Sequence, residues 1–214
     1  MAGSVRAGWR PAAAVLPLVV WLAWGCGSAE TKPPAGGGVG LDDGPTRWLM
    51  LPDEQKQVRK LGSTREAVAF IEEFWRRRDP DPTLPGNEFS RAFYERVEAA
   101  DRLYSEGGTR GSLTDRGRAL ILLGAPSTQR YGQKAVPTWD PGRPGSRPTV
   151  QARNIVVETW VYPLTDLPPE LVKLVEDEAP VPEVILVFTV ETRGTYLTEG
   201  EDYLELAVRA AVRE

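Results

Sequence analysis

A short apolar run near the N-terminus decides which part of this 214-residue chain is available to form a folded core. Arg6 and Arg10 precede about 13 largely apolar residues between Ala12 and Trp24, an arrangement that is typical of a secretory signal peptide. A membrane-spanning helix needs about 20 apolar residues, and Pro17 interrupts this run. The run therefore predicts export, with a folded part that begins further along the chain.

The apolar run ends at Cys26, which is the only cysteine of the chain. The segment from Leu22 to Cys26 resembles the lipobox of bacterial lipoproteins, in which small residues precede a cysteine that receives a lipid. Gly25 fits that pattern, whereas Trp24 stands where a small residue is usual. We expect residues 1–26 to be a signal peptide and Cys26 to hold the protein on a membrane. The protein would then belong to the bacterial cell envelope, facing the periplasm or the exterior; cleavage near Ala29 would instead give a secreted protein.

Two further segments follow the predicted signal. Residues 27–62 begin with a stretch rich in Gly and Pro, which cannot bury a core and is typical of a flexible tether. Leu49 to Leu61 is charged with scattered Leu and Val, which predicts a short helix at the end of this segment. The folded domain is expected over residues 63–214.

The first half of that domain carries two helical patterns. Ser63 and Glu66 have the spacing of a capping box, and apolar residues recur at helical intervals through Arg78. Three prolines between 79 and 86 prevent this helix from continuing. Asn87 can cap a second helix, which Gly107-Gly108 would end. The sequence therefore predicts a pair of helices.

The second half changes to shorter apolar runs. We expect a buried strand over 119–123, a long mobile loop over 127–153, a strand over 155–162, a helix over 167–175 and a strand over 184–190. Over 199–213 a helix, capped by Thr198 with Glu201, is favoured over an edge strand. Helices that precede strands without a βαβ rhythm indicate an α+β fold, with the helical pair packed on a small antiparallel sheet of three or four strands.

Composition removes several classes of chemistry. The chain has no histidine and, apart from Cys26, no cysteine, so histidine triads, His-ligated zinc or copper, thiol catalysis in the domain and internal disulfides lack their atoms. The net charge of −4 argues against a nucleic-acid partner, because phosphate-backbone binding needs a basic face. We therefore expect no cofactor and no metal centre.

The densest polar cluster of the domain runs from Thr114 through Asp115 and Arg116 to Arg118. A half-buried arginine is usually matched by carboxylates in bidentate pairs. The predicted partners and neighbours complete a set of candidate site residues: Asp79, Glu88, Thr114, Asp115, Arg116, Arg118, Glu158 and Trp160.

Residues 66–190 resemble a known family, the GWxTD domains of bacterial envelope and secreted proteins, whose name describes a Gly-Trp-x-Thr-Asp motif. The resemblance rests on Phe74-Trp75, Arg78-Asp79-Pro80, Thr83, Pro85, Asn87-Glu88-Phe89, Tyr94-x-Arg96-Val97, Gly111-x-x-Thr114-Asp115-Arg116-Gly117-Arg118, Ile121, Gly124-x-Pro126 and Glu158-x-Trp160-x-Tyr162. Ser112 stands where the motif has its tryptophan. The large apolar side chain of the motif is therefore absent at this position. The resemblance implies a fold and no activity.

Two functions follow as hypotheses. In the first, the domain is a non-catalytic module that binds an envelope protein, peptide or glycan, and the charged cluster is a structural ion-pair network. In the second, it is a hydrolase or transferase of envelope polymers, with Asp115 or Glu158 as acid or base. A calcium site at Asp79, Asp81 and Glu88 fits no familiar loop, and among the tryptophans Trp139 is the better candidate for a sugar-stacking surface.

Overall fold

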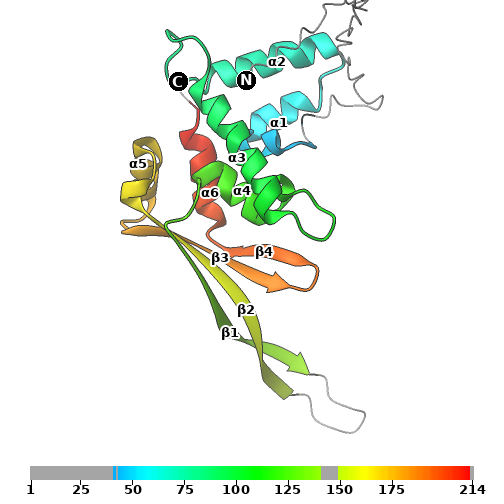
Figure 1. The fold of residues 1–214 in the computed structure, drawn as a ribbon, viewed down its shortest axis with the longest axis vertical. Coiled ribbons are helices and arrows are strands. Elements are labelled where there is room, and N and C mark those ends of the chain that lie inside the picture. Colours follow the sequence, from blue (N-terminus) through cyan, green and yellow to red (C-terminus); the bar gives the residue numbers. More distant parts are fainter. Residues whose placement is uncertain (1–40, 42, 141–148, 213–214) are drawn as a thin grey trace, which may run out of the picture. The chain divides into compact units, whose positions relative to one another are not determined.

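The structure is a computed structural model that describes residues 41, 43–140 and 149–212. Cys26, the predicted signal peptide and the Gly-rich start of the predicted tether lie outside the described residues. The described chain is an α+β fold of helices and a four-stranded antiparallel sheet (Figure 1), which confirms the predicted class. Its elements are η1 (Pro45–Leu49), α1 (Pro52–Val58), α2 (Thr64–Arg76), α3 (Glu88–Tyr104), η2 (Gly111–Leu113), α4 (Asp115–Leu123), β1 (Thr128–Asp140), β2 (Thr149–Pro163), η3 (Leu164–Asp166), α5 (Pro169–Glu178), β3 (Glu183–Glu191), β4 (Gly194–Glu199) and α6 (Glu201–Ala210).

The sheet is a meander in the order β1-β2-β3-β4. Its inner face is buried under the helices: Trp160 and Tyr162 of β2 lie opposite Leu186 and Val184 of β3, and all four side chains are inaccessible or nearly so. The ring of Trp160 packs against Tyr104 of α3, with 5.4 Å between the ring centroids. The tryptophan therefore belongs to the core between the helices and the sheet.

The two predicted N-terminal helices begin where the sequence indicates. The Ser63 hydroxyl accepts a hydrogen bond from the backbone N–H of Glu66, and the Asn87 side chain accepts one from the N–H of Ser90. Each bond satisfies a backbone donor that the first turn of a helix leaves free. The short helix expected between residues 49 and 61 is α1, and the C-terminal helix is α6. The predicted capping box at Thr198 is wrong, because Gly200 in a left-handed conformation precedes α6.

A buried ion pair fastens η1 and α1 to the end of α2. Glu54 of α1 is 3% exposed and Arg78 is 1% exposed, and two Arg78 nitrogens donate to the Glu54 carboxylate at 2.7 and 3.0 Å. Arg78 also donates to the carbonyl oxygens of Leu49 and Phe74. Burial lowers the pKa of Arg78, and the interaction with Glu54 opposes that change. The guanidinium thus joins three segments at one point.

Residues 119–123 form the end of helix α4, so the predicted strand is wrong. Ala119, Leu120, Ile121 and Leu123 are all buried, because α4 lies between η1, α3, α6 and β4. A helix enclosed on most sides loses the apolar and polar alternation that marks a surface helix. A short continuous apolar run of this kind cannot be told from a buried strand by its pattern.

The predicted mobile loop over 127–153 is also wrong where the structure describes it, because β1 and the start of β2 occupy it. Before Val156, β2 does not pair with β3, and its residues from Thr149 onward pair with β1 alone; Figure 1 shows this two-stranded ribbon extending past β3 and β4. Trp139 and Val150 in this ribbon are each more than 60% exposed. A ribbon open to solvent needs no apolar alternation, and its edge strand β1 tolerates Pro137.

Candidate functional site

The cluster around Thr114 begins with a helix cap. The Thr114 hydroxyl accepts a hydrogen bond from the backbone N–H of Gly117 at 3.1 Å and donates one to the carbonyl oxygen of Gly111 at 2.8 Å. Thr114 therefore starts α4 and holds the preceding turn, η2, against it. The side chain is 7% exposed, so its hydroxyl is a structural group.

Two glycines allow this turn to approach its neighbours. A Cβ atom on Gly111 would lie 1.9 Å from the carbonyl oxygen of Ala100 in α3, and one on Gly117 would lie 1.8 Å from the carbonyl oxygen of Gly111. Both distances are far below van der Waals contact, and both neighbours are backbone atoms that no rotamer change can move. Side chains are therefore excluded at both positions.

Ser112, which the family resemblance predicts to stand in the position of the signature tryptophan, is fully buried. Its N–H donates to the Asp101 carboxylate at 2.8 Å, and its carbonyl oxygen accepts a hydrogen bond from the indole of Trp48 at 2.8 Å. Burial alone would raise the pKa of Asp101, but interactions with Ser112 and Arg110 outweigh it and lower that pKa. The indole of Trp48, from η1, thus lies against the turn at Ser112.

Asp115 and Arg116 bind the helices to the sheet. An Asp115 carboxylate oxygen accepts the backbone N–H of Leu197 in β4 at 2.8 Å. Arg116 donates to Glu106 at 2.6 Å and to Glu158 at 3.4 Å, and its guanidinium lies 5.1 Å from the centroid of the Tyr104 ring. These contacts connect α4 to β2, to β4 and to the turn that follows α3.

The two carboxylates that face Arg116 are themselves fully engaged. Glu158 is 1% exposed and accepts the indole N–H of Trp160 at 2.7 Å. Glu106 accepts the N–H of Thr195 at 2.9 Å and the Thr195 hydroxyl at 3.2 Å. Burial and the neighbouring Glu158 raise the pKa of the Tyr131 hydroxyl. Of the three carboxylates predicted as possible partners of Arg116 or Arg118, Glu158 lies 3.4 Å from Arg116. Glu106 was missed because it stands alone before Gly107 without a pattern.

Asp79 and Glu88 lie outside this group, so their predicted pairing with Arg116 or Arg118 is wrong. Asp79 accepts the N–H of Asp81 at 3.1 Å within the proline-rich turn. Glu88 pairs with Arg91 on the exposed face of α3. Arg118 instead pairs with Glu201 of α6 at 2.6 Å. Within the described residues, no three acidic side chains come close enough together to hold a metal ion.

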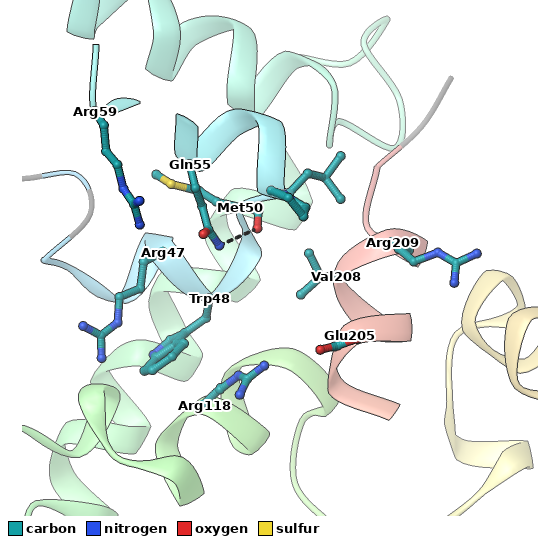
Figure 2. Close-up of a pocket in the computed structure, with 11 residues that line it drawn as sticks. Arg47, Trp48, Met50, Gln55, Arg59, Arg118, Glu205, Val208 and Arg209 are labelled. Carbon is teal, nitrogen blue, oxygen red and sulfur yellow. Dashed lines mark hydrogen bonds between the residues drawn. The ribbon is translucent and has the colours of Figure 1, made fainter. Parts of the chain in front are cut away.

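A separate pocket of about 540 Å³ opens between η1, α1, α4 and α6 (Figure 2). We call it the arginine pocket. Its walls are formed by Arg47, Trp48, Met50, Leu51, Pro52, Gln55, Arg59, Arg118, Glu205, Val208 and Arg209. Four of these side chains are arginines, and Glu205 is the one carboxylate that the described part of the chain places in the lining. The pocket is therefore a positively charged hollow on a chain whose net charge is negative.

The guanidinium groups of the arginine pocket differ in their partners. Arg209 turns toward α5, where it lies 3.7 Å from Glu178, and Arg118 pairs with Glu201. Among the described residues, neither Arg47 nor Arg59 forms an ion pair with a carboxylate. The Nε atoms of Arg47 and Arg118 are buried and have no hydrogen-bond partner within the described part of the chain. The pocket thus keeps cationic donors that the described residues do not satisfy.

The indole of Trp48 contacts two of these guanidinium groups, those of Arg47 and Arg118. The guanidinium carbon of Arg47 lies 4.1 Å from the centroid of this ring, and that of Arg118 lies 5.2 Å away. Contact with an aromatic face stabilises a guanidinium and limits its freedom. Figure 2 shows Arg118 extending toward Glu205, which belongs to the opposite wall on α6. Trp48 therefore links the turn at Ser112 to the wall of the pocket.

Fold and site together define an α+β domain whose motif residues join its helices to its sheet and whose arginine pocket lies on the helical side. The family model of the GWxTD domain matches residues 44–151, half of the chain. The chain belongs to the GWxTD domain family. No curated protein and no solved structure matches it. No helix in the described ranges has both the length and the apolar character needed to cross a membrane.

Proposed function

We propose that this protein is a lipid-tethered binding module of the bacterial cell envelope that recognises an anionic ligand in the arginine pocket and catalyses no reaction. The observation that carries the proposal is that Arg47 and Arg59 line the pocket and, among the described residues, form no ion pair with a carboxylate. Guanidinium groups are the side chains best suited to bind carboxylate and phosphate oxygens in a defined geometry. A small anionic envelope component, or an acidic group on a protein or glycan, is the ligand class.

The motif residues favour binding over the alternative of a histidine-independent hydrolase. A carboxylate catalyst must reach the substrate, whereas Glu158 is nearly inaccessible and hydrogen-bonded to Trp160 and Arg116. Asp115 is hydrogen-bonded to the backbone of β4. Neither residue lines the arginine pocket. Charged groups engaged in this way stabilise the domain, and the pocket supplies cations without an acid and base pair.

Binding can be tested by titrating the full chain with glucuronate, glucose 6-phosphate and neutral glucose while recording NMR signals of arginine Nε–H groups. We expect at least one anionic probe to shift the signals of Arg47 and Arg118, and glucose to leave them unchanged. Arg59→Gln should weaken that binding about tenfold, the effect of about 1.4 kcal/mol, because an exposed cation is removed from the rim. Arg65→Gln, on an exposed position of α2, is the matched control.

The outcomes separate binding from catalysis. If neither anion moves these signals, the arginine pocket is not a ligand site and the proposed function is wrong. If the probe is converted to a new compound that accumulates with turnover, the domain is an enzyme. Recovery of unchanged probe with saturable binding supports the module.

The membrane tether has its own test. Cys26→Ser removes the thiol that a lipid would modify, so the protein should move from the membrane fraction to the periplasmic or secreted fraction. Mass spectrometry of the N-terminal peptide should show a lipid on the unsubstituted protein and none on the variant. Unchanged fractionation together with an unmodified N-terminus would show that Cys26 is not lipidated.

A further inference from the structure

We infer that the ligand of the arginine pocket is an organic phosphate monoester, an inference that rests on the proposed anion-binding function. The pocket volume of about 540 Å³ falls within the range of small-molecule sites, roughly 300–1,000 Å³. It exceeds what a bare phosphate ion needs. The ligand should therefore carry an organic group beside its charged one.

The charge of the lining favours phosphate over a single carboxylate. Arg47 of η1, Arg59 just after α1 and Arg118 of α4 contribute guanidinium groups to the lining. A phosphate monoester carries a charge between −1.5 and −2 at pH 7 and has three acceptor oxygens. It can accept from several guanidiniums at once, whereas a carboxylate has two oxygens and one charge. Several guanidinium groups in one lining match the group with more charge and more acceptors.

The other residues of the lining indicate the chemistry of the organic part of the ligand. Trp48, Met50, Leu51, Pro52 and Val208 form an apolar surface next to the cations. Glu205 faces the same space from α6, where a carboxylate can accept hydrogen bonds from ligand hydroxyls. A sugar phosphate and the phosphate headgroup of an acylglycerol both combine a phosphate with hydroxyls or an apolar body. Both ligands contain a phosphate monoester. Separate probes are needed to tell a sugar phosphate from a lipid headgroup.

The first experiment compares affinities of the full chain for glucose 6-phosphate and glucuronate at pH 8 and pH 5. We expect the phosphate to bind at least about tenfold more tightly at pH 8. Its affinity should fall up to about tenfold at pH 5, because the second ionisation of a phosphate monoester has a pKa of about 6. The guanidiniums that face the pocket from η1, α1, α4 and α6 stay protonated across this range. No histidine exists in the chain to titrate near pH 6.

Two further probes identify the source of the phosphate. Dihexanoyl phosphatidic acid below its micelle concentration represents a lipid headgroup, and inorganic phosphate represents the bare anion. Tighter binding of the acylglycerol phosphate than of glucose 6-phosphate assigns the ligand to lipid, and the reverse order assigns it to a soluble sugar phosphate. If inorganic phosphate binds as tightly as both esters, the apolar walls play no part and the inference is overturned.

A variant that binds the ligand more tightly tests the pocket without the risk that misfolding causes the change in affinity. Glu205→Gln removes the charge of the carboxylate that the described residues place in the lining, while the amide oxygen can still accept a hydrogen bond from a ligand hydroxyl. Affinity for glucose 6-phosphate should therefore rise about fivefold, because a like charge no longer repels the ligand. Glu98→Gln, on an exposed position of α3, should change nothing. No gain in Glu205→Gln would show that the phosphate does not enter this pocket.

The result also separates this inference from the proposed function. Equal, pH-independent binding of glucuronate and glucose 6-phosphate would leave an anion-binding module and overturn the phosphate monoester. Absence of binding by every anionic probe would remove the proposed function itself.

Discussion

Replacing Gly117 or Gly111 by alanine is expected to prevent stable folding of the domain. The added Cβ would lie 1.8 Å from the carbonyl oxygen of Gly111 in the first case, and 1.9 Å from that of Ala100 in the second. To remove these clashes, the backbones of α3, η2 and α4 must separate. This separation opens the core around Ala100 and Ala119. Overpacking a well-packed core costs about 1–3 kcal/mol, and more where backbone must move. We expect a loss of at least about 3 kcal/mol.

Urea denaturation followed by far-ultraviolet circular dichroism measures this loss. Gly132→Ala is the matched control, because its Cβ would lie 3.9 Å from a Val157 methyl group, an ordinary contact. The control should leave the midpoint of unfolding almost unchanged. Alanine variants of Gly111 and Gly117 that unfold at the same urea concentration as the control would show that α3 and α4 do not approach this closely.

The second large effect is expected at the buried pair of Glu54 and Arg78. Arg78→Ala leaves the Glu54 carboxylate buried at 3% exposure and removes the donors to the carbonyl oxygens of Leu49 and Phe74. Breaking a buried ion pair by removing one partner costs about 3–5 kcal/mol where the remaining charge has no compensation. Glu54 would keep its ion pair with Arg77, so we expect Arg78→Ala to cost an amount near the lower end of that range. Glu54→Ala should cost more, since Arg78 would keep its charge without a carboxylate.

A double-mutant cycle distinguishes this pairing from simple loss of packing. Glu54→Met combined with Arg78→Met should be less destabilising than the sum of the single methionine variants, because no buried charge is left unpaired. Arg91→Ala breaks an ion pair with Glu88 whose side chains are about 70% exposed, and exposed pairs contribute about 0–1 kcal/mol. Strict additivity of the methionine variants would mean that the two charges do not stabilise each other.

The candidate site was predicted in part because some of its members carry local signals. Thr114 caps a helix and Trp160 alternates along a strand, patterns that depend on neighbours in sequence. Glu158 was one of three carboxylates proposed as partners of the arginines, and it lies beside Arg116, 42 positions away in the sequence. The arginine pocket gave no such signal, because Arg47, Arg59, Arg118 and Arg209 are far apart in the sequence. Their presence in one lining depends on the packing of η1 and α6 beside α4.

Helix caps and apolar periodicity, which act over a few residues, were enough to predict the α+β class, the starts of α2 and α3, and the strands β2 and β3, whereas β1 and β4 were not predicted as strands. Only the tertiary structure decided that residues 119–123 are helical, since enclosure by η1, α3, α6 and β4 removes the polar face that would have marked a helix. It likewise decided that β1 pairs with β2 over a solvent-exposed ribbon, and that Glu54, Glu106 and Glu201 are the partners of Arg78, Arg116 and Arg118. Ion pairs between distant residues follow from how the elements pack, and no local pattern of charge encodes them.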